Sequence, residues 1–220
     1  MASVRPGALG PFRGKTGDVE IYKVNNKYFS KSARCATTVP ATEDKKMQQD
    51  KLKLVTKFYK KVTRTLRMGY RIKSKNKGVH AAISDHVNTA VAGTLPNLKL
   101  IYPKLQVTKS DNGFHGGFEV SLEALPDAKV RINWKAPDKV REQYPGVADL
   151  DDLVHLTFFN ETKQKAFEYF QVAERQAKTI VCDLPYGIEG DLFHGYLFFT
   201  SIDGKYVSDS DYAGSFILPR

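Results

Sequence analysis

The chain has 220 residues, of which 41% are hydrophobic and 26% are charged, which suggests one or two soluble globular domains. It contains no run of 18 apolar residues and no apolar segment near Met1, so we expect neither membrane insertion nor a standard secretory signal. We therefore expect a cytoplasmic location, or a place in a particle assembled inside the cell. The only cysteines, Cys35 and Cys182, are expected to be free thiols.

The net charge of +10 is unevenly distributed along the chain. Residues 1–105 hold 22 Lys and Arg against 6 Asp and Glu, a net charge of +16, whereas residues 106–220 hold 12 against 18, a net charge of −6. Such asymmetry predicts an anionic partner for the first half, either nucleic acid or an acidic protein. Head-to-tail association of two copies is a further reading, and a solvated surface without a partner is the plainest one.

The segment GPFRGKTG, residues 10–17, resembles a phosphate-binding loop without meeting its requirements. That loop needs Gly, four residues and then Gly-Lys-Ser/Thr, but the first position here is Leu9. Pro11 lacks an N–H group, and the residues after Gly17 favour a strand rather than a helix. We therefore interpret the segment as a glycine-rich turn that leads into a hairpin.

A β-hairpin is predicted next, with strands near 18–24 and 27–33 on either side of Asn25 and Asn26. Asparagine tolerates positive φ, which suits a two-residue hairpin loop. From Thr42, a good helix N-cap, the segment to Met68 contains neither Gly nor Pro and predicts one long amphipathic helix. A shorter helix over 79–91 would complete an αα-hairpin.

From Leu98 onward the pattern changes to short strands. We expect strands at LKLIYPKLQV, FEVSLEAL, KVRINW, LVHLTFFN, AFEYFQ, AKTIVCDL and GYLFFTS, and a last one over 206–218. The Asp203-Gly204 turn is a strong hairpin signal. The predicted fold class is therefore α+β: a basic β-hairpin and two-helix module over 1–97, followed by an all-β sandwich over 98–220.

Two resemblances add to this reading. KVRINWKAP (129–137), TIVCDLP (179–185) and GYLFFTSIDGKYVSDS (195–210) resemble strands of fibronectin type III and immunoglobulin-like modules. RPGALGPFRGKTGDV (5–19), TEDKKMQQDKLKLVTKF (42–58) and SIDGKYVSDSDYAG (201–214) resemble an uncharacterised family of bacterial proteins, a domain of unknown function. The first resemblance implies a sandwich fold, and the second implies no activity.

Catalytic and metal-binding patterns are weak. His80 and His86 are six residues apart and fall on different faces of a helix, while His155 and His194 are expected to be neighbours across strands. Asp151 and Asp152 are interpreted as loop acids, Cys182 as a core residue, and no Ser lies in a GxSxG motif. We therefore expect no enzyme activity, no cofactor and no metal.

The leading hypothesis is a non-enzymatic structural or interaction protein that self-assembles, as a homo-oligomer, or docks onto a larger assembly, such as a phage-like particle, through its basic module. A first alternative is nucleic-acid binding by the helix 43–68 and the hairpin 18–34, mainly through phosphate charge. A second is a sandwich that binds carbohydrate or protein through loops bearing Tyr144, Tyr186, Phe193 and Tyr212. The residues expected to contact an anionic partner are Arg13, Lys15, Lys23, Lys27, Lys53, Lys57, Lys60, Lys61, Arg64, Arg67 and Arg71.

Overall fold

In a computed structural model the chain forms two compact units, Met1–Thr42 and Glu43–Arg220. The division differs from the expected boundary between 97 and 98, because the helices after residue 42 share a core with the later strands. The structure describes residues 2–4, 13–33, 40, 42–70, 78–110, 113–136, 148–185 and 190–219.

The first unit is a four-stranded antiparallel sheet in the order β1-β4-β3-β2. Asn25 and Asn26 join β3 to β4 with φ angles of 48° and 65°, which confirms the predicted tight turn. No side chain described between residues 13 and 33 is buried, so the described part of this sheet has no closed core of its own. The strands are β1 (Ala2–Val4), β2 (Gly14–Thr16), β3 (Val19–Val24) and β4 (Lys27–Ser32).

The Gly-Lys-Thr sequence lies in strand β2, which pairs with β3 and does not begin a helix. This agrees with the rejection of a phosphate-binding loop. The expected turn is displaced, however: residues 14–16 are extended and the chain turns at Gly17 and Asp18, where Gly17 has a φ of +58°. Residues 10–12 lie outside the described residues.

The second unit begins with three helices, α1 (Glu43–Tyr59), α2 (Thr63–Gly69) and α3 (Gly78–His86). The single helix expected to reach Met68 is wrong, because the chain turns between α1 and α2. The Thr63 hydroxyl donates back to the Lys60 carbonyl at 2.9 Å, which competes with the helical ladder. The Thr65 amide donates to the Glu168 carboxylate at 2.7 Å, so an acid from a distant strand caps α2.

The strand expected over 98–107 is also corrected. Only Lys99 and Leu100 are extended there, as β6, which pairs with β5 (Val91–Ala92). A 3-10 helix, η2 (Tyr102–Lys104), follows because Pro103 has no amide hydrogen to give to a sheet. Gly93 makes the β5–β6 turn possible: its φ is +97°, and a Cβ there would lie 2.2 Å from the Asn97 carbonyl oxygen.

The remaining strands form an antiparallel sandwich, as expected. One sheet has the order β11-β8-β7 and the other β10-β9-β12-β13. Together with the helices, this confirms the α+β class. The strands are β7 (Phe118–Leu125), β8 (Lys129–Lys135), β9 (Leu153–Asn160), β10 (Lys165–Glu174), β11 (Thr179–Asp183), β12 (Leu192–Thr200) and β13 (Asp211–Ile217), with a 3-10 turn, η3 (Arg175–Ala177), after β10.

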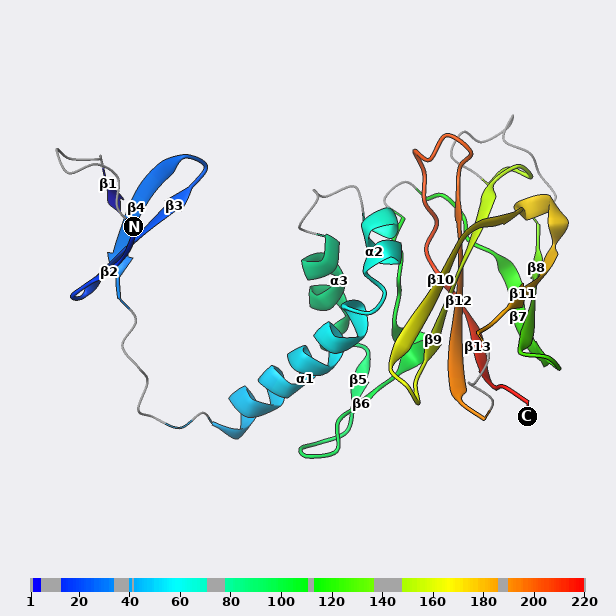
Figure 1. The fold of residues 1–220 in the computed structure, drawn as a ribbon, viewed down its shortest axis with the longest axis horizontal. Coiled ribbons are helices and arrows are strands. Elements are labelled where there is room, and N and C mark those ends of the chain that lie inside the picture. Colours follow the sequence, from blue (N-terminus) through cyan, green and yellow to red (C-terminus); the bar gives the residue numbers. More distant parts are fainter. Residues whose placement is uncertain are drawn as a thin grey trace. The chain divides into compact units, whose positions relative to one another are not determined.

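The second unit has three layers, because the helices cover the outer face of the four-stranded sheet (Figure 1). Successive residues of β9 alternate between two cores: Phe158 packs in the sandwich, whereas Phe159 packs under the helices. Strand β12 does the same with Leu197 and Tyr196. Both strands are therefore buried on both faces, and the helical layer is fixed to the sandwich by apolar packing.

Candidate interaction surface

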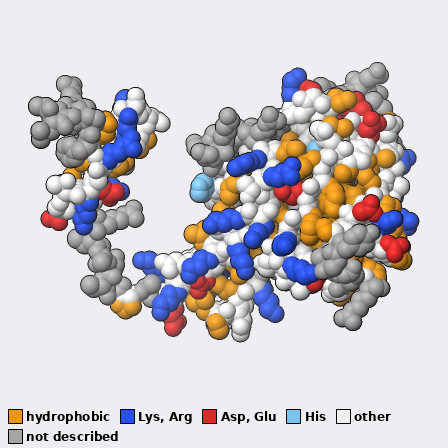
Figure 2. Space-filling view, in the orientation of Figure 1, with side chains coloured by type: hydrophobic (Ala, Val, Ile, Leu, Met, Phe, Trp, Pro, Cys, Tyr) orange, Lys and Arg blue, Asp and Glu red, His pale blue; other side chains and the backbone are white. Residues whose placement is uncertain are grey.

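Lysine and arginine side chains cover the outer side of α1 and α2. Seven basic and no acidic residues occur from Lys51 to Tyr70, and Figure 2 shows Lys and Arg gathered over this part of the molecule. Since the buried stripe of α1 and α2 faces the sheet, the charged residues are left facing solvent. We call the following exposed residues the basic helical surface: Lys53, Lys57, Lys60, Lys61, Arg64 and Arg67.

Two of these side chains have partners. Lys53 forms an ion pair of 2.8 Å with Asp50, one turn earlier in α1. The Arg64 guanidinium lies 5.0 Å from the centre of the Phe170 ring in β10, a cation–π distance. Within the described residues, no carboxylate lies within 4.0 Å of the other four, so their charge is not neutralised by neighbours. Such a surface attracts anions.

The structure brings together only some of the residues predicted to contact an anionic partner. The six named above share one surface of the second unit, whereas Arg13, Lys15, Lys23 and Lys27 belong to the first unit. Arg71 lies outside the described residues. The basic residues predicted to contact one anionic partner are therefore divided between the two units.

The first unit combines its basic residues with aromatic rings. Lys23 Nζ lies 5.4 Å from the Tyr28 ring centre, and Lys31 Nζ lies 5.1 Å from that of Tyr22. The Tyr22 and Phe29 rings stack across β3 and β4 with centres 5.9 Å apart. Lys31 also pairs with a carboxylate of β3 at 3.1 Å, so this sheet is less purely basic than the helices.

A groove beside α1 was missed by sequence reasoning. It has a volume of about 320 Å³ and lies between α1 and the β5–β6 turn. Leu54, Leu95, Pro96 and Leu98 give it aliphatic walls, and Asp50, Lys53 and Lys57 give it a charged rim. Leu95, on the wall of the groove, is 37% exposed. The only signal in the sequence is that leucines occur both in the helix and in the later turn. They do not predict a groove, because the groove forms only when the turn folds against the helix.

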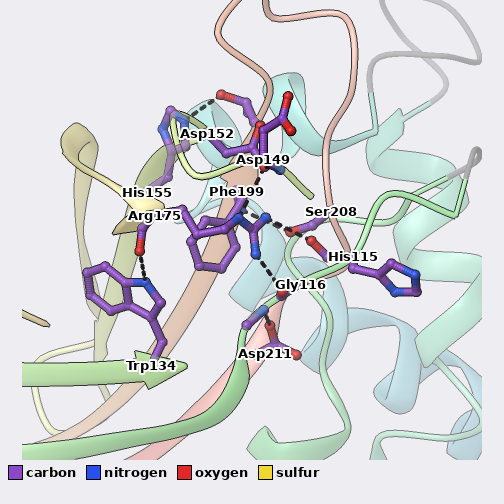
Figure 3. A network of polar contacts seen from close by, with 12 residues as sticks. His115, Gly116, Trp134, Asp149, Asp152, His155, Arg175, Phe199, Ser208 and Asp211 are labelled. Carbon is purple, nitrogen blue, oxygen red and sulfur yellow. Dashed lines mark hydrogen bonds and ion pairs between the residues drawn. The ribbon is translucent and has the colours of Figure 1, made fainter. Parts of the chain in front are cut away.

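A fully buried arginine occupies one end of the sandwich (Figure 3). The Arg175 guanidinium donates to the Asp152 carboxylate at 3.1 Å and to the carbonyls of His115 and Gly116 at 2.9 and 2.8 Å. It lies 3.6 Å from the centre of the Phe199 ring. The Arg175 carbonyl in turn accepts the Trp134 indole N–H at 2.8 Å. These contacts join η3, the 115–116 segment, β8 and β12.

Asp152 is therefore not the loop acid expected from the sequence, since it is fully buried in an ion pair. Burial raises the pKa of the Asp152 carboxyl to about 6, although the Asp149 amide and the Arg175 guanidinium both favour its charged form. Burial likewise lowers the pKa of Arg175. This arginine is fully buried and donates to two carbonyls and a carboxylate, so it ties segments of the fold together and does not face a ligand in solvent.

Three histidines are buried in separate places. His155 and His194 are not neighbours across strands, because His155 pairs with Phe198 and His194 with Phe159 in the register of β9 and β12. His194 lies between the Glu161 carboxylate and the Tyr212 hydroxyl, each at 2.9 Å. An acid, an imidazole and a hydroxyl in line suggest nucleophilic catalysis. Burial raises the pKa of Tyr212, however, and so disfavours the ionised form of this hydroxyl.

We expect acid to destabilise the protein through His155. This side chain is fully buried, and its ring nitrogens contact the Thr200 hydroxyl at 2.9 Å and the Gln171 amide at 3.3 Å. Burial lowers its pKa to about 4. The unfolded chain takes up this proton near pH 6.5, so stability falls as the pH decreases from about 6.5 to about 4, by about 2–3 kcal/mol between pH 7.5 and 4.5.

Urea unfolding of the wild type and of His155→Gln at both pH values isolates this contribution. The glutamine side chain keeps a donor and an acceptor group but does not titrate in this pH range. The loss of stability between pH 7.5 and 4.5 should therefore be smaller in the variant, by about 2–3 kcal/mol. His86 and His194, whose pKa values are also lowered by burial, remain in both proteins and cancel in the comparison. Parallel pH profiles would contradict the assignment.

No group of three or more His, Cys, Asp and Glu side chains in the described ranges is arranged to hold a metal ion. Cys182 is buried, and burial raises the pKa of its thiol to about 11, in agreement with its expected core position. Cys35 lies outside the described residues. Phe193 and Tyr212, expected in loops, lie instead in strands β12 and β13, where Phe193 is buried and Tyr212 half-buried. Tyr144 and Tyr186 lie outside the described residues. None of the helices α1 to α3 is long and apolar enough to span a bilayer.

Comparison with known proteins gives one family and several distant structures. A family model described as "Family of unknown function (DUF6266)" matches residues 13–214. No curated protein matches the sequence. Similar solved structures include the FN5 domain of Drosophila Lar, at 12% identity and a TM-score of 0.32 over 50% of this chain and 98% of that one. The fn3 domain of human contactin 1 matches at 9% identity and a TM-score of 0.32, over 48% of this chain and 78% of that one. The alpha chain of the chicken interferon gamma receptor matches at 12% identity and a TM-score of 0.37, over 56% of this chain and 57% of that one.

Proposed function

Since the chain belongs to DUF6266, a family of unknown function, we propose that it is a non-enzymatic interaction protein, which docks onto an acidic protein partner through its basic helical surface. The observation that carries this proposal is the run of basic residues without an acid on the outer side of α1 and α2. Four of its six residues stand on α1 and α2, and Lys60 and Lys61 lie in the short turn between these helices, which are fixed by a shared core. A rigid charged surface loses little conformational entropy when a partner binds.

The surroundings of this surface favour a protein over a nucleic acid. The aliphatic groove beside Lys53 and Lys57 can bind apolar side chains of a partner. A nucleic acid has no such side chains to place in it. Phe170, half-buried under Arg64, does not offer an open ring face for base stacking. Charge would set the rate and specificity of the encounter, and the apolar groove would add affinity.

Nucleic-acid binding is the second candidate, and the first unit favours it. Its exposed sheet carries Lys23 and Lys31 beside Tyr28 and Tyr22. Lysines that alternate with aromatic rings can contact phosphates while bases stack. On this hypothesis binding would depend steeply on salt.

We expect charge reversal on the helices to remove binding of an acidic polypeptide. Replacing Lys57, Lys60, Lys61 and Arg67 by Glu should weaken binding of fluorescent poly-L-glutamate by at least about tenfold, because four attractive contacts of up to about 1 kcal/mol each become repulsive. The measurement is fluorescence anisotropy at physiological salt, with 20-nucleotide poly-dT as the nucleic-acid probe.

The control reverses four basic residues of the three-stranded sheet and the turn before β11, the first three of which form surface ion pairs: Lys129, Arg131, Lys135 and Lys178. It changes the net charge by the same amount on another surface, so it should weaken binding much less. Equal losses in both variants would refute a localised surface. Poly-dT binding that is tighter than polyglutamate binding and survives the helical reversal would favour the nucleic-acid candidate.

A further inference from the structure

The groove beside α1 has the size and lining of a socket for aliphatic side chains. An apolar cavity of about 150 Å³ already holds a benzene-sized group, and this groove has a volume of about 320 Å³. Its walls are Leu54, Leu95, Pro96 and Leu98, without an aromatic ring. One or two branched aliphatic side chains therefore fit it.

The rim of the groove selects the charge of its occupant. Lys53 and Lys57 line it, and Lys60 and Lys61 continue the basic surface toward α2. Asp50 is the only acid on the rim among the described residues, and Lys53 pairs with it at 2.8 Å. The complementary segment is therefore an exposed aliphatic side chain next to carboxylates.

The same chain presents such a segment at one end of its sandwich. Ile202 is 62% exposed and precedes the exposed Asp203, and Leu150 is 40% exposed and precedes the exposed Asp151. The two turns lie at the same end, because Leu153 and Thr200 are paired in adjacent strands. We call Leu150, Asp151, Ile202 and Asp203 the acidic tip. Its charge is partly offset, since Lys205 pairs with Asp203 at 2.9 Å.

We propose that the acidic tip of one copy inserts into the groove of a second copy, with Ile202 and Leu150 in the socket and the carboxylates near Lys53 and Lys57. The groove and the tip lie at opposite ends of the second unit: in Figure 1 the β5–β6 turn is at the bottom and the turn after β12 at the top. One chain cannot join its own two ends. The contact is heterologous, so a pair of copies keeps one free groove on one copy and one free tip on the other, and open chains can grow.

This inference rests on the proposed function of the basic helical surface, for which it names the partner as a second copy. The contact is small, so it is weak and needs a high protein concentration or a template. Chain growth on a larger assembly would raise the local concentration and make a weak contact sufficient.

Complementation between two disabled variants tests the proposal. Leu95→Asp puts a negative charge in the socket, and the double variant Leu150→Ser/Ile202→Ser removes the aliphatic side chains of the tip. All three positions are exposed, so both variants should fold. In sedimentation velocity at about 0.5 mM, the wild type should exceed the monomer mass of 24.7 kDa. Each variant alone should stay monomeric.

An equimolar mixture of the two variants should form dimers and nothing larger, because one keeps an intact tip and the other an intact groove. Val181→Ser, an equally exposed aliphatic position on β11, should associate like the wild type. A monomeric wild type, association of either variant alone, or a mixture that stays monomeric would each overturn the proposal. Polyglutamate binding that persists in a monomeric wild type would leave the proposed function standing while this inference fails.

Discussion

Replacing Arg175 by methionine is expected to lower the free energy of unfolding by about 3–5 kcal/mol. The variant keeps most of the side-chain volume but leaves the buried Asp152 carboxylate without its cation and two backbone carbonyls without donors. Each unsatisfied buried group costs the free energy of its lost hydration. Since a domain of this kind has about 5–15 kcal/mol of stability in total, the loss should be visible at once in urea unfolding.

The double variant Arg175→Met/Asp152→Ala separates the ion pair from simple packing. Removing the unpaired carboxylate should recover part of the loss, so the double variant should be more stable than the sum of the single losses predicts, by at least about 1 kcal/mol. A loss below about 1 kcal/mol for Arg175→Met, or strictly additive losses, would show that this end of the sandwich is held by other contacts.

Replacing Phe58 by alanine is expected to cost about 3–5 kcal/mol, the range for deleting a buried aromatic side chain. Phe58 is 1% exposed and its ring lies 4.9 Å from that of Phe159 in β9 and 6.3 Å from that of Tyr196 in β12, centre to centre. It thus joins α1 to both central strands of the four-stranded sheet. Hydrogen exchange should show the helical amides opening more often than those of the sandwich, since the lost contacts join these layers.

Lys57→Ala, at the neighbouring exposed position, is the control and should change stability by less than about 0.5 kcal/mol. If Phe58→Ala accelerated exchange equally in β8 and in α1, the helices and the sandwich would form one cooperative unit without a weaker joint between them. Unchanged exchange in α1 would contradict the role of this ring in holding the helical layer.

Local chemistry made much of the fold predictable from the sequence. Two asparagines specified the β3–β4 turn, and alternation of polar and apolar residues located β7 and β8. The break between α1 and α2 was not predicted, because the carboxylate that caps α2 at Thr65 belongs to Glu168, more than one hundred positions away. A tertiary contact of this kind leaves no local pattern.

The double burial of the four-stranded sheet did leave a signal. LVHLTFFN and LFHGYLFFT are nearly continuous apolar runs, which are typical of strands covered on both faces rather than one. The burial of Arg175 left no signal in the sequence, since a single arginine after a strand is ordinarily exposed. Composition could name the basic residues of the candidate surface, but only the three-dimensional fold separates those of the helices from those of the first unit and forms the groove.

The three-layer packing also determines where this protein can vary. In β8, buried and less buried positions alternate, so every second residue can change with little consequence for packing. In β9 and β12, almost every side chain borders one core or the other, and a change of volume at any position disturbs a close-packed layer. We therefore expect the fold to tolerate substitutions better at the turns and on the outer side of the helices than in the central strands.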